Sequence, residues 1–509
     1  MATTYLSPGV YVEEVSGGVK PIAGVGTSTG AFVGIAEKGE IGKAKLITNW
    51  SQFVKEFGGF IPNGYLAYAV YGFFAEGGTS CYVVRTCHYT DIMTPATKSA
   101  ETSAFTLVDN SDAKCIRVSA LSEGVWGHNI SVKTGAASEG SGFKIRVRYQ
   151  GIEDDVEIFD KLTMSDVEDV INTASNFIRV EKDAWKEGST DVTGSGNVPK
   201  NDQEGNLSGG DDGISGIVAN DFIGDKSAQN GLYAFDVVDD INIVAIPDMY
   251  GDRGGILDGL NYCKNRKDCF FIADPPYGLT PTQAKDFKNA TGTYSGNAFN
   301  SSYGALYYPW VYISDPLTGK KKLVPPSGVV AGTYAYTDSA RGVHKAPAGI
   351  SEGYLDSVVG IEKIITKGEH DVLNPAQVNV IRSLTAGICI WGARTLSADS
   401  EWLYVNVRML LLYIEESVDE GTQWVVFEPN DPALWGKVKR NITAFLMRVW
   451  RDGALFGTTP EEAFFVKVDE ENNPPEVRDA GQLIIEVGVA PVKPAEFVII
   501  RISQKTLTK

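Results

Sequence analysis

Two aspartates stand where α/β enzymes carry catalytic groups. Asp248 and Asp274 each end an apolar run with strand composition, and catalytic side chains of α/β folds lie at the carboxyl ends of strands. Pro247 precedes the first aspartate and Pro275-Pro276 follow the second, which favours carboxylates that shape turns. We interpret both as turn residues and keep a hydrolase-like enzyme as the least favoured alternative.

The other chemistry-bearing residues form no recognisable site. The chain has no GxxxxGK[ST] phosphate loop, and Gly24-Val25-Gly26 lacks the third glycine of a dinucleotide turn. The four histidines lack HxxxH spacing and the six cysteines lack a CxxC pair. We therefore expect no catalytic residue, metal or cofactor, and reduced, buried thiols.

Composition bounds the class of protein. A chain of 509 residues should hold more than one domain, and 43% hydrophobic with 22% charged residues is ordinary for globular proteins. The net charge of −18 argues against nucleic acid or an anionic membrane as partner. Residues 1–8 show no secretory signal and no run approaches about 20 apolar residues. We expect synthesis in a bacterial cytoplasm and no membrane insertion.

The elements that must position these residues divide the chain into five parts. We predict an N-terminal arm and linker over 1–21, an α/β domain in two parts over 22–96 and 213–373, an inserted antiparallel β domain over 97–212, and a C-terminal α+β domain over 374–509.

Periodicity supports these divisions. Strand-like runs over 30–36, 81–85, 241–248, 269–276 and 305–312 alternate with amphipathic helices such as 50–57 and 66–73, whereas 97–212 holds short strands between Gly, Ser and Asp turns and ends in a predicted loop over 186–212. We expect irregular structure over the Gly-, Ala- and Pro-rich residues 327–349, and helical stripes over 403–414 and 434–449.

Both chain ends have strand composition. A terminal strand either folds back into its own sheet or adds to the sheet of another copy. The flexible linker Ser16–Pro21 favours addition, with Leu483–Val487 as a neighbouring strand near the C-terminus. The residues expected to pair are Val10, Tyr11, Val12, Glu13, Glu14 and Val15 in the N-terminal arm and Phe497, Val498, Ile499, Ile500, Arg501 and Ile502 in the C-terminal arm, with Gly17 and Gly18 as hinge.

Several stretches together resemble the tail sheath proteins of contractile phage tails and contractile injection systems. They are Ser7–Glu14, Gly342–Gly349, Ile390–Leu396, Tyr404–Arg408 with Ile414–Ser417, and the acidic and then β-rich tail. The resemblance flanks residues 97–212, where it is weakest, and rests on the order and spacing of these stretches.

The resemblance implies a structural subunit without catalytic residues. Such subunits stack as six-fold rings around an inner tube protein, between a baseplate and terminator or cap proteins, and contract to drive the tube through a target envelope. Their terminal arms complete a sheet in a neighbour's C-terminal domain. A non-contractile tube or surface-layer protein that uses the same arms is the alternative.

An acidic helix end is the last candidate site. Negative charge is unfavourable at a helix C-terminus, so a basic partner is a reasonable hypothesis, either the inner tube or the basic face of the next helix in a neighbouring subunit. A solvated helix end explains the same residues equally well. The charged residues concerned are Glu415, Glu416, Asp419 and Glu420 on the first helix and Lys437, Lys439 and Arg440 on the next.

Overall fold

The structure is a computed structural model that describes residues 22–150, 152–182, 197–497 and 499. Contacts divide the chain into two compact units. Residues 26–412, with the segment that begins at Lys493, form the larger, here called the α/β unit. Residues 22–25 and 413–492 are the described part of the smaller, here called the C-terminal unit.

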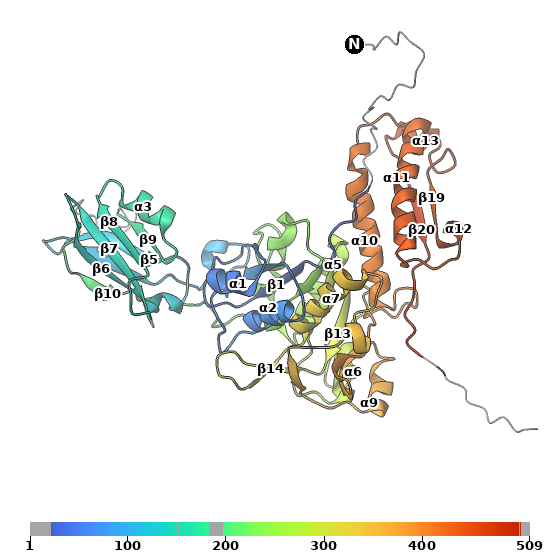
Figure 1. Ribbon diagram of the computed structural model, residues 1–509, viewed down its shortest axis with the longest axis horizontal. Coiled ribbons are helices and arrows are strands. Elements are labelled where there is room, and N and C mark those ends of the chain that lie inside the picture. Colours follow the sequence, from blue (N-terminus) through green and yellow to red (C-terminus); the bar gives the residue numbers. More distant parts are fainter. Residues whose placement is uncertain (1–21, 151, 183–196, 498, 500–509) are drawn as a thin grey trace, which may run out of the picture. The chain divides into compact units, whose positions relative to one another are not determined.

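An eight-stranded sheet organises the α/β unit (Figure 1). The strands from β17 to β3 run parallel and the edge strands β18 and β2 run antiparallel to them. The central strands are apolar and buried along their whole length, as a parallel sheet covered on both faces requires. In spatial order the strands are β18 (Gly387–Ile390), β17 (Val378–Leu384), β13 (Gly304–Tyr308), β12 (Phe270–Ala273), β11 (Ile243–Ala245), β1 (Gly30–Gly34), β3 (Cys81–Arg85) and β2 (Lys45–Ile47).

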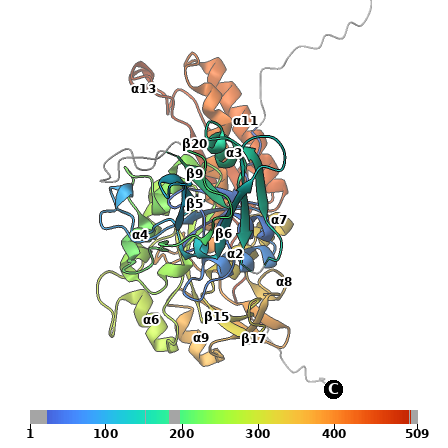
Figure 2. The ribbon, with the colours of Figure 1, turned by 90° about the vertical axis from the view of Figure 1, so that its left-hand side faces the viewer.

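Helices cover this sheet, and two of them, α1 and α2, lie where the sequence periodicity predicts them. Helix α1 begins after Asn49, whose side chain accepts a hydrogen bond from the N–H of Gln52 at 2.9 Å, and ends at Gly58 with a φ of +84°. Helices α6 and α9 lie side by side (Figure 2). The helices are α1 (Trp50–Phe57), α2 (Leu66–Ala75), α4 (Ala219–Ile223), α5 (Arg253–Arg266), α6 (Pro281–Asn289), α7 (Ser327–Arg341), α8 (Gly349–Glu352) and α9 (Lys367–Leu373).

Helix α7 occupies residues 327–341 of the segment 327–349, for which we predicted irregular structure. The prediction was wrong over the helix, whereas residues 342–348 are irregular. Its small residues pack against α2: a Cβ at Gly328 would lie 2.4 Å from the Cα of Ala69, and a Cβ at Gly332 would lie 2.5 Å from the carbonyl oxygen of Phe73. Glycine lowers intrinsic helix stability. Here it allows two buried helices to approach closely, which composition alone does not reveal.

The segment between β3 and β11 holds two antiparallel sheets with a core of their own. Neither sheet shares a strand with the eight-stranded sheet (Figure 1). Part of the predicted 186–212 loop is a strand, β10, because its backbone pairs with β6. The elements are β4 (Ala104–Val108), β5 (Lys114–Ala120) and β9 (Ile178–Glu181) in one sheet, β10 (Glu204–Asn206), β6 (Ile130–Ala136), β7 (Phe143–Tyr149) and β8 (Glu157–Leu162) in the other, and helix α3 (Val167–Ala174).

A buried arginine joins this β-rich segment to the eight-stranded sheet. Arg85, the last residue of β3, is fully buried. Its Nη1 donates to the carbonyl of Gly39 at 2.9 Å and to the carbonyl of Glu123 at 2.8 Å, and its Nη2 lies 3.9 Å from Asp212. One guanidinium therefore ties residues 123 and 212 of the β-rich segment, and the loop after β1, to the end of a core strand.

A small three-stranded sheet and the strands after residue 374 complete the α/β unit. Strands β17 and β18 pair within the eight-stranded sheet, although residue 374 was the predicted start of the C-terminal domain. The compact C-terminal unit begins instead at Tyr413. The small sheet contains β15 (Lys321–Val324), β14 (Val311–Ser314) and β16 (Val358–Ile361).

The C-terminal unit contains two long helices and a two-stranded sheet. Helix α11 begins as predicted after Asp431, whose carboxylate accepts from the N–H of Leu434 at 2.8 Å, with Pro432 in the first position. The elements are α10 (Val405–Thr422), of which residues from Tyr413 belong to this unit, α11 (Pro432–Arg451), α12 (Pro460–Ala463), β19 (Phe464–Lys467), α13 (Pro475–Asp479) and β20 (Glu486–Val489).

Strand β20 lies three residues beyond the start of the predicted strand over 483–487. The N–H of Ile484 donates to Asn473 Oδ1 at 2.6 Å, and its carbonyl accepts from Asn473 Nδ2 at 2.9 Å. A side chain thus takes the backbone groups that a strand partner would need, so pairing with β19 starts only at Glu486.

Candidate assembly sites

The first described residues are held by the C-terminal unit. The N-terminal arm and its hinge lie outside the described residues and stay predictions. Ile22 is 2% exposed, and its carbonyl accepts a hydrogen bond from the guanidinium of Arg448. The N–H of Val25 donates to Ser417 Oγ at 3.2 Å. Residues 22–25 are therefore fixed to α10 and α11 at the point where the arm begins.

A glutamate holds the other chain end to the α/β unit. Glu496 Oε1 accepts from Arg394 Nε at 2.8 Å and from Asn374 Nδ2 at 2.7 Å. Its Oε2 accepts from the Tyr404 hydroxyl at 3.2 Å and pairs with Arg394 Nη2. The two side chains of the ion pair are 12% and 18% exposed, so the pair is largely shielded from solvent. We call this group the Glu496 clamp.

The electrostatics of the clamp favour the charged carboxylate. Burial by itself raises the pKa of Glu496, but the hydrogen bonds from Arg394, Asn374 and Tyr404 outweigh burial and lower the pKa below its usual value. A bidentate arginine–carboxylate pair also fixes geometry. The clamp therefore holds the backbone of residue 496 in one place near neutral pH.

The described residues beyond the clamp are exposed. Phe497 is 73% exposed and Ile499 is 78% exposed, and neither belongs to a strand in this single chain. The other residues of the predicted 497–502 strand lie outside the described residues. Two large apolar side chains thus face solvent directly after a fixed anchor.

The clamp itself was not predicted from the sequence. Arg394 belongs to one of the stretches that carry the family resemblance, and its main chain is held by Asn379 of β17: the N–H of Arg394 donates to Asn379 Oδ1 at 2.8 Å. No local pattern connects it with Glu496, which is 102 residues away. The Pro494-Ala495-Glu496 sequence before an apolar run was the only available signal.

The two-stranded sheet is the described element best suited to strand addition. Among the described residues, β19 and β20 pair only with each other. Phe464 and Val466 are buried, and β19 packs against α11, whereas Phe465 on the opposite face is 58% exposed. Each strand therefore keeps an outer edge on which another strand can form a ladder.

The charged candidates lie on the two long helices. Glu415, Asp419 and Glu420 are exposed and Glu416 is half-buried on α10, and the last two of the acidic set fall in or next to its last turn. The basic residues Lys437, Lys439 and Arg440 are exposed on α11. Their partners in an assembly remain predictions.

The point where α/β sheets usually bind ligands is filled by the chain itself. The chain leaves β1 toward β3 on one side and returns at β11 on the other, so the β1–β11 edge is the topological switch point. There the Asp248 carboxylate accepts from the N–H groups of Ile35, at 2.8 Å, and Tyr65. Burial raises the pKa of Asp248 to about 6 although backbone donors oppose the shift. This carboxylate occupies the N-terminus of α2 as a bound anion would.

Asp274 also has a structural environment. Its Oδ1 accepts from the N–H of Ser327, the first residue of α7, at 2.9 Å, and the described residues place no hydrogen-bond donor on Oδ2. Burial raises the pKa of Asp274 to about 7. Residues 26–30 have the spacing GxSxG, but they lead into β1, which begins at Gly30, whereas a nucleophile elbow lies between a strand and a helix.

Two further features are absent from the described residues. They contain no group of three or more His, Cys, Asp or Glu side chains arranged to hold a metal. None of the described helices is long and apolar enough to cross a membrane. The six cysteines are buried and unpaired with one another.

Comparisons with known proteins agree with the fold. A sequence model of the phage tail sheath protein central domain matches residues 259–396, and one of the phage tail sheath C-terminal domain matches residues 397–505. The tail sheath protein of Vibrio phage KVP40 is 24% identical over 249 residues, which are 46% of this chain and 36% of that protein. The tail sheath protein of Burkholderia phage BcepMu is 30% identical over 226 residues, or 42% of this chain and 44% of that protein.

The matches to these curated relatives therefore span less than half of the relatives' lengths. A solved structure extends the likeness of fold to the whole chain. The sheath complex of an extracellular contractile injection system, in its contracted state, has a TM-score of 0.59 and 22% identity over 99% of each chain. Two consecutive sheath domain models, related tail sheath sequences and a shared fold agree: residues 259–505 are similar to the central and C-terminal domains of phage tail sheath proteins.

Proposed function

We propose that this protein is the structural subunit of a contractile sheath, which polymerises helically around an inner tube and contracts to drive the tube through a target envelope. The observation that carries the proposal is the C-terminal end of the chain, where the Glu496 clamp is followed at once by exposed Phe497 and Ile499. An anchored, extended apolar segment is suited to strand addition on another copy. A head-to-tail contact that does not close on itself generates a helical assembly.

The β19–β20 sheet is the acceptor that we propose. Residues 10–15 of one neighbour and 497–502 of another would extend this two-stranded sheet, because its outer edges carry no strand among the described residues. Gly17 and Gly18 would let the arm stay paired while subunits rotate. Stacked six-fold rings, a baseplate and terminator proteins complete the proposed assembly.

In the proposed mechanism, contraction is driven by the free energy of folding and of contacts between subunits. Asp248 fills the switch point at which an α/β fold would hold a ligand. Contraction would then release conformational free energy stored in the extended assembly as new subunit contacts form. We propose no catalytic residue and no cofactor.

Electron microscopy of purified protein tests the proposal. The intact chain should form striated hollow tubes. A chain without residues 1–16 and a chain that ends at Glu496 should each remain folded, with an unchanged melting temperature, and fail to polymerise. Flat sheets would favour a surface-layer protein, and tubes of ordinary length from either truncation would refute arm exchange.

A further inference from the structure

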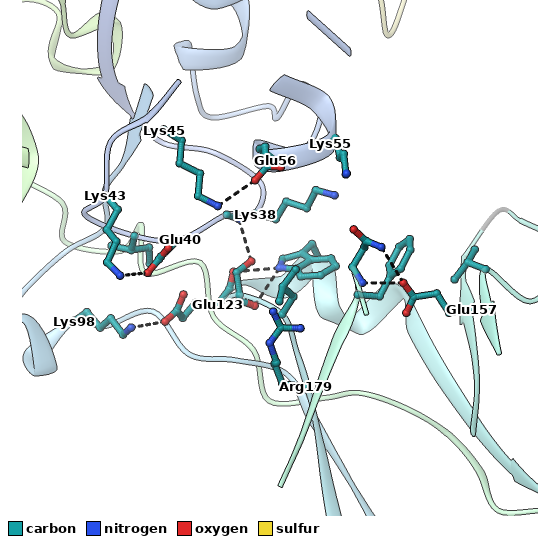
Figure 3. A pocket seen from close by; sticks show the side chains of 18 residues that line it. Lys38, Glu40, Lys43, Lys45, Lys55, Glu56, Lys98, Glu123, Glu157 and Arg179 are labelled. Atoms are coloured by element: carbon teal, nitrogen blue, oxygen red, sulfur yellow. Dashed lines mark hydrogen bonds and ion pairs between the residues drawn. The ribbon is translucent and has the colours of Figure 1, made fainter. Parts of the chain in front are cut away.

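A polar cleft lies where the β-rich segment meets the α/β core. It has a volume of about 910 Å³ and is lined by residues of α1, of the loop after β1 and of β9. Figure 3 shows the charged side chains around it. Trp126 also lines the cleft. Its volume lies in the range of pockets that hold small-molecule ligands.

The cleft is basic, although the chain is acidic. Its lining contains six basic and four acidic side chains, an excess of two positive charges in a chain of net charge −18. The basic side chains are those of Lys38, Lys43, Lys45, Lys55, Lys98 and Arg179, and the acidic ones are those of Glu40, Glu56, Glu123 and Glu157.

Half of the basic side chains are already neutralised. Lys43 pairs with Glu40, Lys45 pairs with Glu56 at 3.1 Å, and Lys98 pairs with Glu123. These pairs are visible as dashed contacts in Figure 3. They use three of the four carboxylates of the cleft.

The fourth carboxylate is also engaged. Glu157 accepts hydrogen bonds from the Ser175 hydroxyl and from the N–H of Asn176, the latter at 2.8 Å. Arg179 is bonded elsewhere: its Nη1 donates to the carbonyls of Ser175 and Ile178 at 3.1 Å each. Each acidic side chain of the cleft thus already has a partner within the chain.

Three cations are left without a carboxylate partner among the described residues: Lys38, Lys55 and Arg179. Lys38 is half-buried, with its Nζ 5.5 Å from the centre of the buried Trp126 ring. Burial lowers the pKa of Lys38, and the nearby charge of Lys55 lowers it further, although the charges of Glu37 and Glu56 oppose the shift. A partly desolvated cation beside another cation is unfavourable unless an anion joins them.

We propose that this cleft binds a small polyanion that carries two or more phosphate or carboxylate groups. Lys38 follows β1, Lys55 lies on α1 and Arg179 lies on β9. A monovalent anion carries too little charge to balance three cations. The ligand bridges the core and the β-rich segment. The inference is independent of sheath function.

Isothermal titration calorimetry of the full chain with tripolyphosphate and with citrate tests this site. We expect saturable binding of at least one of the two, and a loss of affinity of tenfold or more in the double variant Lys38→Gln/Lys55→Gln. The matched control is Lys43→Gln, which lines the same cleft but is paired with Glu40. It should change affinity less than threefold. Preference for one probe assigns phosphate or carboxylate chemistry.

Two outcomes would overturn the proposal: no saturable heat with either probe, or equal weakening by the double variant and by the control, which indicates non-specific attraction. Hydrogen exchange guards against a folding defect. Tripolyphosphate or citrate, whichever binds, should protect amides of residues 38–57 and 177–181 in the wild type and leave them unchanged in the double variant. Protection confined to other segments would contradict the assignment.

Discussion

The two units of this protein differ in how far their sheets are complete. The eight-stranded sheet has buried parallel strands between antiparallel edge strands and fills its own switch point with Asp248. The sheet of the C-terminal unit has two strands, and a two-stranded ribbon has marginal stability by itself. The sheet of the α/β unit is therefore complete within one chain, whereas the sheet of the C-terminal unit is suited to binding strands of other subunits.

The largest expected effect is a difference in stability between the same substitution, glycine to alanine, made in each of the two units. Gly328→Ala should lower the free energy of unfolding of the α/β unit by about 3 kcal/mol, because the new Cβ would lie 2.4 Å from the Cα of Ala69. Gly436→Ala in α11 is the matched control: only Arg440 lies within 4 Å of its Cβ. That variant should gain up to about 1 kcal/mol. Chemical denaturation followed by circular dichroism measures both.

Equal effects of the two substitutions would contradict the comparison, because they would mean that α7 is no more tightly packed than the exposed side of α11. The monomer should be used for this measurement. Contacts within an assembly would add stability of their own and obscure the difference.

The next effect is a pH dependence confined to the α/β unit. The pKa of Asp274 rises from its ordinary value of 3.8 to about 7 in the folded protein. The folded state therefore holds a proton that the unfolded state has released, and the associated stability is present below about pH 4 and lost as pH rises through 7. The free energy of unfolding of the wild type should therefore fall by roughly 2 kcal/mol between pH 5 and pH 7 because of Asp274, and Asp274→Asn should abolish this fall.

Thermal melts at pH 5, 6 and 7 check this prediction by the difference between wild type and variant at each pH. An exposed residue provides the control: Asp154→Asn should run parallel to the wild type throughout. A constant difference between the wild type and Asp274→Asn at all three pH values would show that Asp274 is ionised in the fold.

The third effect concerns the clamp. Glu496→Gln removes the charge from a shielded pair and should raise the protein concentration needed for polymerisation about tenfold, while the melting temperature of the monomer changes little, because the clamp holds only a terminal segment. The folded pKa of Glu496 is lowered, so the clamp is intact above the ordinary glutamate value and is lost as pH falls through the lowered value. Sedimentation of polymers measures the effect, and an unchanged threshold would contradict it.

Sequence periodicity identified the elements that are amphipathic or strongly capped. Helices α1 and α11 follow from apolar stripes and from Asn49 and Asp431. Helix α7 was missed because close packing, which the sequence does not display, compensates for its glycines. The order of sheath-like stretches predicted the resemblance to tail sheath proteins, and domain models over residues 259–505 confirmed it.

The candidate sites were less predictable for a physical reason. The Glu496 clamp depends on Arg394, Asn374 and Tyr404, which are far apart in the sequence. The shift of β20 depends on Asn473 binding the backbone of Ile484. Both features depend on single polar side chains that contact residues elsewhere in the sequence. The pattern of hydrophobic residues does not predict such contacts.

The smallest effect tests whether the acidic end of α10 serves an assembly. The double variant Asp419→Lys/Glu420→Lys replaces unfavourable negative charge at the end of this helix with favourable positive charge, so it should stabilise the monomer by about 0.3–1 kcal/mol for each residue. If the acidic set contacts a basic partner, the same variant should reduce polymer yield severalfold. The reversal at Glu415 and Glu416 lies further from the helix end and should reduce yield without the gain in folding.

Opposite signs for folding and assembly would distinguish an interface from a solvated helix end, because a solvated end predicts the gain in stability with no loss of polymer. The same reasoning applies to the surface charges of the two units. If the C-terminal unit binds other subunits, its surface charges should favour contacts that a single chain lacks. A charge reversal at an exposed residue of the α/β unit, such as Asp154→Lys, should by contrast alter neither the melting temperature nor the polymer yield.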